Sequence, residues 1–130
     1  MIAIDTNVVV RFLTNDDPAQ ANRAEKVLRT ENIFLPKTVL LETAWVLQGA
    51  YGLARADVVL ALRKLLGLAG IVVEDGPVIE RALDWYERGV DFADALHVAS
   101  SGAAEQFVTF DRALFRRGKS LIVAPAVVEL

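Results

Sequence analysis

Residues 2–7 read Ile-Ala-Ile-Asp-Thr-Asn, a short apolar run that ends in a carboxylate, a hydroxyl and an amide. The apolar run predicts a buried β-strand, because strands covered on both faces are apolar at consecutive positions. In such parallel sheets ligands bind beyond the carboxyl ends of the strands, which is where Asp5 would lie. The alternative is that Asp5 opens a turn or caps the next segment, as Asp often does after a strand.

Short apolar strands and longer amphipathic helices alternate along the rest of the chain. We expect further strands at 33–35, 71–73, 107–110 and 121–124. Helical segments are expected at 8–13, from Asp17-Pro18, from 37, from 55, from 76, from 91 to about 104, and at 113–115. This alternation predicts an α/β fold, a three-layer α/β/α sandwich with a central short-stranded parallel sheet, in a single domain over residues 1–130.

The composition excludes several classes of protein. The chain has no cysteine, which rules out disulfides and thiolate metal sites. No stretch approaches the roughly 18 uninterrupted apolar residues of a membrane span, and the N-terminus lacks the pattern of a secretory signal. We therefore expect a cytoplasmic protein without a membrane partner. The net charge of −3 does not indicate a nucleic-acid binder, but it leaves room for a local basic rim around an acidic site.

Four acidic residues stand at strand ends or in apolar helical contexts. Asp5 and Asp111 each follow a predicted strand, and parallel strands bring such side chains to the same edge of a sheet. Glu42 lies inside an apolar helix, where a solvent-facing side chain fits as well as a buried one. Asp94 lies in the first turn of a helix, and we interpret Asp91 as the N-cap and Asp94 as the inward residue. Acidic residues at a helix N-terminus also stabilise the helix, by roughly 0.3–1 kcal/mol.

Converging carboxylates repel one another unless a cation is present. A site made only of oxygen ligands suits Mg²⁺ or Mn²⁺ rather than Zn²⁺. Two such ions about 4 Å apart clamp the attacking and leaving oxygens of a phosphodiester and ionise the attacking water. The acidic residues therefore indicate metal-dependent hydrolysis of a phosphodiester.

The whole chain resembles PIN-domain ribonucleases of the VapC toxin type. The resemblance lies in Ile-Asp-Thr-Asn-Val at 4–8, in Glu42 within a helix, in Asp-Phe-Ala-Asp-Ala-Leu-His-Val-Ala at 91–99, and in Val-Thr-Phe-Asp-Arg at 108–112. It implies a Mg²⁺-dependent endoribonuclease, with Mn²⁺ as a plausible substitute. It also implies a toxin of a type II toxin–antitoxin pair that acts on transfer RNA or ribosomal RNA and inhibits translation. The partners would be a VapB-like antitoxin and a second copy of the chain, paired through roughly residues 18–60.

The resemblance also implies roles for individual residues. Catalysis and metal binding would rest on Asp5, Glu42, Asp94 and Asp111. Hydrogen bonds from Asn7 and Thr109 would support them, and Asp91 would be a cap or an outer ligand. His97 stands where the family has an aliphatic residue, and we interpret it as packed or partly exposed rather than as part of the site.

Basic and aromatic residues allow two interpretations each. The basic residues that could rim the site and hold phosphates are Arg11, Lys37, Arg112, Arg116, Arg117 and Lys119. A solvated surface loop explains the cluster at 112–119 equally well. Trp45, Tyr51, Trp85 and Tyr86 could stack on bases, but core or dimer packing fits the two tryptophans better.

Other classes of protein fit the sequence less well. A haloacid-dehalogenase-like phosphatase needs a second Asp two residues after its nucleophile, and Asn7 stands there. A receiver-like domain needs an acidic pair near the N-terminus, whereas Asp5 stands alone. A non-catalytic binding module of the same fold remains an alternative, although it would be expected to lack part of the acidic set.

Overall fold

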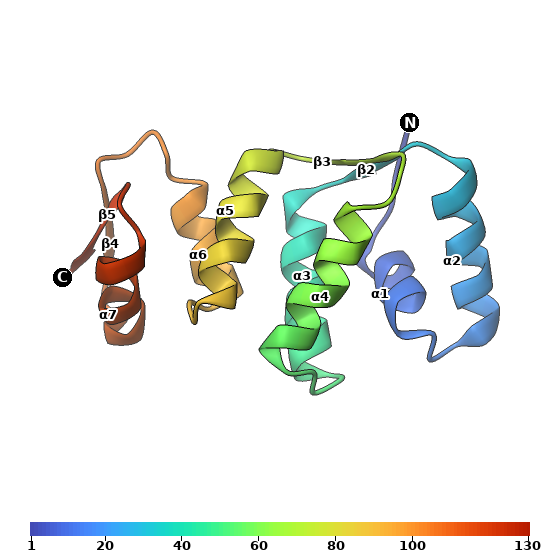
Figure 1. The fold of residues 1–130 in the computed structure, drawn as a ribbon, viewed down its shortest axis with the longest axis horizontal. Coiled ribbons are helices and arrows are strands. Elements are labelled where there is room, and N and C mark those ends of the chain that lie inside the picture. Colours follow the sequence, from blue (N-terminus) through green and yellow to red (C-terminus); the bar gives the residue numbers. More distant parts are fainter. The chain divides into compact units, whose positions relative to one another are not determined.

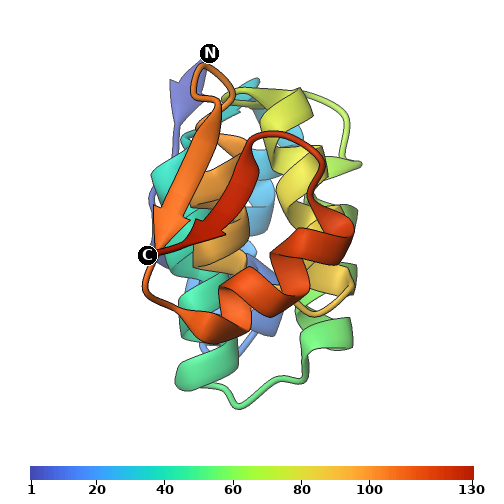
Figure 2. The same ribbon diagram turned by 90° about the vertical axis from the view of Figure 1, so that its left-hand side faces the viewer.

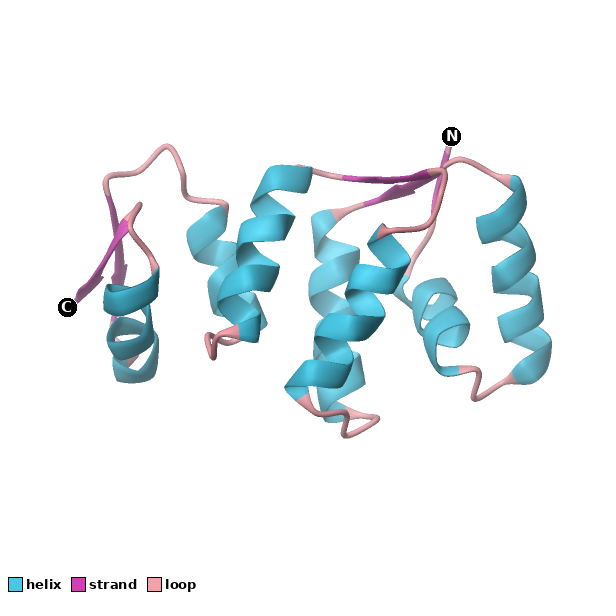
Figure 3. Cartoon of the chain, in the orientation of Figure 1, coloured by secondary structure: helices cyan, strands magenta, loops and turns pink.

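A computed structural model describes all 130 residues of the chain as short strands alternating with longer helices (Figures 1 and 3). The helices are α1 (Thr6–Thr14), α2 (Pro18–Thr30), α3 (Lys37–Gly49), α4 (Arg55–Leu66), α5 (Gly76–Glu87), α6 (Phe92–Ala99) and α7 (Arg112–Leu121). The strands are β1 (Ile2–Ala3), β2 (Ile33–Leu35), β3 (Ile71–Val73), β4 (Gln106–Thr109) and β5 (Ala126–Glu129). The chain divides into two compact units, Met1–Gly76 and Pro77–Leu130.

The first unit contains a three-stranded parallel sheet in the order β1-β2-β3. Ile2 pairs with Ile33, which in turn pairs with Ile71, so the apolar runs found in the sequence lie side by side. Ile33 and Leu35 of the central strand are fully buried, as expected for the middle of a parallel sheet. Helix α1 packs against α2 and α3, and α4 packs against α3 and β3.

The second unit contains β4 and β5, which pair in parallel with Phe107 opposite Val127. Helix α7 packs on both strands, and Figure 2 shows it beside them. Tyr86 of α5 and Phe92 at the start of α6 meet edge to face with ring centroids 5.5 Å apart, and both are buried. Such aromatic pairs stabilise a core beyond the area they bury.

The α/β class and the parallel pairing of short strands are confirmed, with the strands in two sheets rather than one. The helix starts predicted at Asp17-Pro18, 37, 55 and 76 are confirmed, and the predicted turn at 8–13 belongs to α1. No helix is long and apolar enough to span a membrane. The single domain over residues 1–130 stays a prediction.

Two predicted boundaries are wrong. The strand predicted at 121–124 does not form, because α7 continues to Leu121 and β5 begins only after Pro125. The helix predicted to run to about 104 ends at Ala99. Just beyond that end, the Ser101 hydroxyl donates a 2.8 Å hydrogen bond to the His97 carbonyl, a local bond of the kind that competes with helix continuation.

Candidate active site

The second unit brings three of the predicted acidic residues into one electrostatic environment. Burial raises the pKa of the Asp94 carboxyl above its usual value, and the negative charges of Asp91 and Asp111 raise it further. The charge of His97 acts in the opposite direction, so His97, although exposed, lies near this carboxyl. A bound cation would relieve the repulsion between the Asp94 carboxylate and these two negative charges.

Asp91 and Asp94 occupy the positions that the sequence predicts for them. Asp91 is the N-cap of α6, and its Oδ2 accepts a 3.2 Å hydrogen bond from the Asp94 backbone N–H. Asp94 is half-buried, whereas Asp91 is exposed. The cap satisfies one of the free N–H groups of the first helical turn.

Asp111 follows β4 and caps α7. Its Oδ1 accepts hydrogen bonds from the backbone N–H groups of Ala113 (2.9 Å) and Leu114 (3.1 Å). The Thr109 hydroxyl oxygen accepts a 2.9 Å hydrogen bond from the Asp111 backbone N–H, which fixes the strand-to-helix turn. The second carboxylate oxygen, Oδ2, has no protein donor, so it is free to bind a cation.

Asp5 has the same arrangement in the first unit. It is the N-cap of α1, and its Oδ1 accepts a 3.1 Å hydrogen bond from the Val8 backbone N–H. Asp5 therefore caps a helix, the alternative noted from the sequence, and its exposed Oδ2 still lacks a protein donor. The Asn7 side chain is exposed as well and makes no hydrogen bond with another residue. Glu42 of α3 is exposed rather than buried, and its role as a ligand stays a prediction.

The oxygen donors of the predicted acidic residues suit a hard divalent cation. Within each unit, no three His, Cys, Asp or Glu side chains lie close enough together to hold a metal ion. Asp91, Asp94 and Asp111 belong to the second unit, and Asp5 and Glu42 belong to the first. Carboxylate oxygens that accept no hydrogen bond from the protein are suitable ligands for Mg²⁺.

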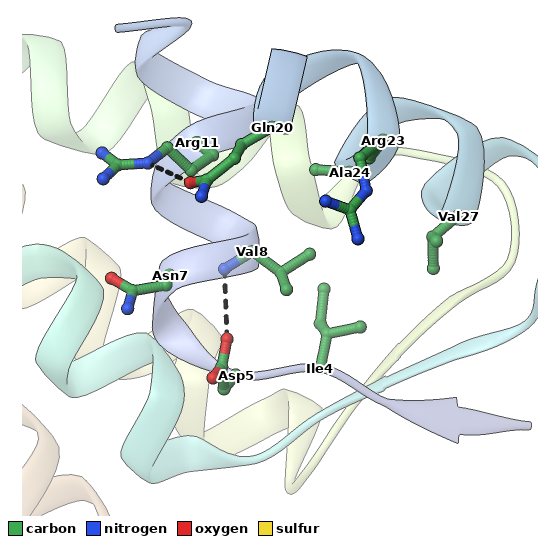
Figure 4. A pocket seen from close by; sticks show the side chains of 9 residues that line it. All are labelled: Ile4, Asp5, Asn7, Val8, Arg11, Gln20, Arg23, Ala24 and Val27. Carbon is green, nitrogen blue, oxygen red and sulfur yellow. Dashed lines mark hydrogen bonds between the residues drawn. The ribbon is translucent and has the colours of Figure 1, made fainter. Parts of the chain in front are cut away.

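A groove opens beside Asp5, between the end of β1, α1 and α2 (Figure 4). Its volume is about 400 Å³. The lining includes Arg23 of α2, which is not among the basic residues predicted to contact RNA. A pattern in the sequence could have pointed to Arg23. Together with Gln20, Ala24 and Val27 it follows the i, i+3, i+4, i+7 spacing of one helix face.

Several of the basic residues proposed for RNA contacts already have protein partners. The Arg11 guanidinium lies 2.8 Å from an Asp16 carboxylate oxygen, and the Lys37 ammonium lies 2.7 Å from Asp75. Arg112 lies 3.4 Å from Glu129. Arg116 and Arg117 of α7 form no ion pair. The side chains of Arg11 and Lys37 therefore stabilise the fold through these ion pairs.

The aromatic residues divide into exposed and packed groups. Trp85 of α5 is buried, as core packing predicts, and the neighbouring Tyr86 is buried as well. The Tyr51 hydroxyl donates a 2.5 Å hydrogen bond to the Asp16 carboxylate. Trp45 is 74% exposed, so core packing is wrong for this residue and dimer packing stays a prediction.

A comparison with known protein families gives one match. The model of the PIN domain matches residues 2–120, nearly the whole chain and parts of both units. The chain belongs to the PIN-domain family. Members of this family are generally nucleases and typically use a divalent metal. No curated protein matches the chain.

Proposed function

We propose that this PIN domain is a Mg²⁺-dependent endoribonuclease and the toxin of a VapBC-type toxin–antitoxin pair. The observation that carries the nuclease proposal is the match of the PIN domain, a family of nucleases, to residues 2–120. The negative charges of Asp91 and Asp111 near the half-buried Asp94 support it. The family match does not favour the phosphatase. The toxin role rests on the VapC-like motifs.

The proposed metal ligands are Asp94 and Asp111 in the second unit and Asp5 and Glu42 in the first. When bound, the metal would ionise the attacking water and neutralise charge on the phosphodiester. Backbone N–H groups hold Oδ1 of Asp5 and of Asp111 in place. This leaves one oriented oxygen on each carboxylate. The adjacent positive end of the helix dipole limits the cost of the negative charge at each position.

The remaining parts of the proposal concern partners. The substrate would be transfer RNA or ribosomal RNA, and its cleavage would inhibit translation. A VapB-like antitoxin would bind the chain and block the acidic pocket. The chain would form a homodimer, and the exposed Trp45 in the predicted 18–60 region supports this.

The test of the nuclease is cleavage of total cellular RNA by the purified chain with Mg²⁺, with Mn²⁺ and with EDTA. We expect discrete products in either metal and none in EDTA. Asp5→Asn and Asp94→Asn should reduce the rate at least about 100-fold, because each removes a metal-binding charge. The matched control is Asp17→Asn, since Asp17 caps α2 but is no proposed ligand.

Two results would contradict this proposal. Cleavage that persists in EDTA would show that the reaction does not need a metal ion. Full activity in Asp5→Asn or Asp94→Asn, with the variant folded, would remove that carboxylate from the ligand set. The cleaved ends of the products would identify the RNA target.

A further inference from the structure

The groove beside Asp5 is built from two facing stripes of side chains. Ile4, Asn7, Val8 and Arg11 line one wall, and Gln20, Arg23, Ala24 and Val27 line the other. Both stripes repeat the i, i+3, i+4, i+7 spacing, and α1 packs directly on α2. Figure 4 shows Ile4 and Val8 near each other, with Ala24 and Val27 on α2 across the groove from them.

A hydrogen bond closes one end of the groove. The Arg11 Nε–H donates to Gln20 Oε1 at 2.8 Å, across the two helices. Arg11 is also held by Asp16 at 2.8 Å and by the Tyr51 hydroxyl at 3.2 Å. Its charge is therefore already neutralised, and its part in the groove is to fix the spacing of the walls.

The other polar groups of the groove are free. Arg23 is exposed, forms no ion pair or hydrogen bond, and directs its guanidinium into the groove in Figure 4. The carboxamide of Asn7 is also without a partner. A guanidinium binds phosphate or base acceptors in bidentate geometry, and an amide can donate to and accept from a base edge. The aliphatic floor would cover the face of a planar base.

The dimensions favour a small occupant. A volume of about 400 Å³ lies in the range of pockets that hold one small molecule. An α-helix of a protein partner has a diameter of about 10–12 Å with its side chains and needs a longer trough. The opening at Asp5 would place such an occupant next to the proposed cleavage site.

We infer that this groove binds one nucleotide of the single-stranded RNA substrate, with Arg23 contacting its phosphate or base and Ile4, Val8, Ala24 and Val27 covering the base. The inference rests on the proposed nuclease function and names a substrate subsite for it. It makes Arg23 a determinant of substrate affinity rather than of the chemical step.

The first experiment measures binding without cleavage. The whole chain, labelled at its methyl groups and kept in EDTA, is titrated with AMP, UMP, CMP and GMP and followed by NMR. We expect the methyl resonances of Val8, Ala24 and Val27 to shift with at least one nucleotide. The methyl groups of Leu40 and Leu47, which do not line the groove, should stay unchanged.

The second experiment compares two neutralised cations on the same helix. Arg23→Gln should weaken binding of a single-stranded oligoribonucleotide about 5- to 10-fold and raise KM by the same factor, with kcat unchanged. Lys26→Gln removes an exposed charge of α2 that does not line the groove, and it should change both by less than twofold. Both positions are exposed, so both variants should fold.

The outcomes separate this inference from the proposed function. Equal effects of the two variants would overturn the inference, since they would reflect general electrostatic attraction. Groove methyl groups that respond to a protein partner but to no nucleotide would also overturn it. A wild-type chain that binds nucleotides in the groove yet cleaves no RNA would support the subsite and contradict the nuclease.

Discussion

At the scale of single residues, Asp94 differs from the three predicted acidic residues that cap helices. Asp5, Asp91 and Asp111 each cap a helix and receive backbone hydrogen bonds. Asp94 is half-buried and its carboxylate receives no hydrogen bond from the protein, while two neighbouring acids repel it. The negative charge of Asp94 is therefore less compensated than that of the three capping residues, and removal of this charge should affect stability most.

Asp94→Asn should raise the Tm of the metal-free chain at pH 7. Because the pKa of Asp94 is raised on folding, the stability that its protonated form contributes is lost as the pH rises through that raised pKa. The gain over wild type should therefore shrink as the pH falls toward about 4, where unfolded Asp protonates. Thermal unfolding of the variant and the wild type in EDTA, from pH 4 to 8, measures the difference in Tm.

The matched control is Asp57→Asn, because Asp57 also lies in the first turn of a helix but is exposed. It should give no gain in Tm, since it removes a favourable interaction with the helix dipole. An Asp94→Asn variant less stable than wild type at pH 7 would contradict the interpretation of Asp94.

At the scale of elements, helix caps give some carboxylates two roles. Asp111 holds the first turn of α7 through two hydrogen bonds, at 2.9 and 3.1 Å, and is also a proposed metal ligand. Asp17 holds α2 through a 3.1 Å bond from the Gln20 N–H and is no proposed ligand. Loss of activity in a variant of Asp111 is therefore informative only if capping is measured separately.

Asp111→Ala should lower the free energy of unfolding by about 1 kcal/mol and abolish cleavage. Asp111→Asn keeps an oxygen acceptor for the cap, so it should retain stability while still losing cleavage. Asp17→Ala should lose the same stability and keep full activity. Urea unfolding and RNA cleavage of the three variants separate the roles, and an active Asp111→Asn would exclude this residue as a ligand.

Much of the element order followed from local patterns in the sequence. Asp17-Pro18 marks the start of α2 because an Asp cap and a Pro at the first helical position act within one turn. The C-terminal end depended on tertiary packing instead. A Cβ on Gly118 would lie 2.9 Å from Val127, so the glycine allows β5 to approach α7, and no local pattern reveals this contact.

The candidate site was predictable to the same extent. Asp91 as cap and Asp94 as inward residue follow from their positions in one helix. The ion pair of Lys37 with Asp75 and the hydrogen bond of Arg11 to Tyr51 join residues far apart in the sequence. The sequence therefore left these cations as free RNA contacts, and it did not reveal the facing stripes that make Arg23 part of a groove.

At the scale of the whole molecule, the exposed apolar surface bears on assembly. Trp45 of α3 is 74% exposed, and Leu60 of α4 is 54% exposed. Both lie in the region 18–60, where a homodimer contact is proposed. A tryptophan with this exposure is a typical energetic centre of an interface, because it buries a large area with little loss of conformational freedom.

Trp45→Ser should weaken self-association of the chain about 30-fold, which corresponds to roughly 2 kcal/mol for a central interface residue. Sedimentation equilibrium over a range of concentrations measures the dimer dissociation constant for wild type and variant. The control is Val123→Ser, because Val123 is 93% exposed but lies after α7, outside the proposed contact region. A chain that stays monomeric at 100 µM, or a Trp45→Ser variant that associates as tightly as wild type, would contradict a dimer built around Trp45. A loss shared equally by both variants would indicate nonspecific apolar association instead.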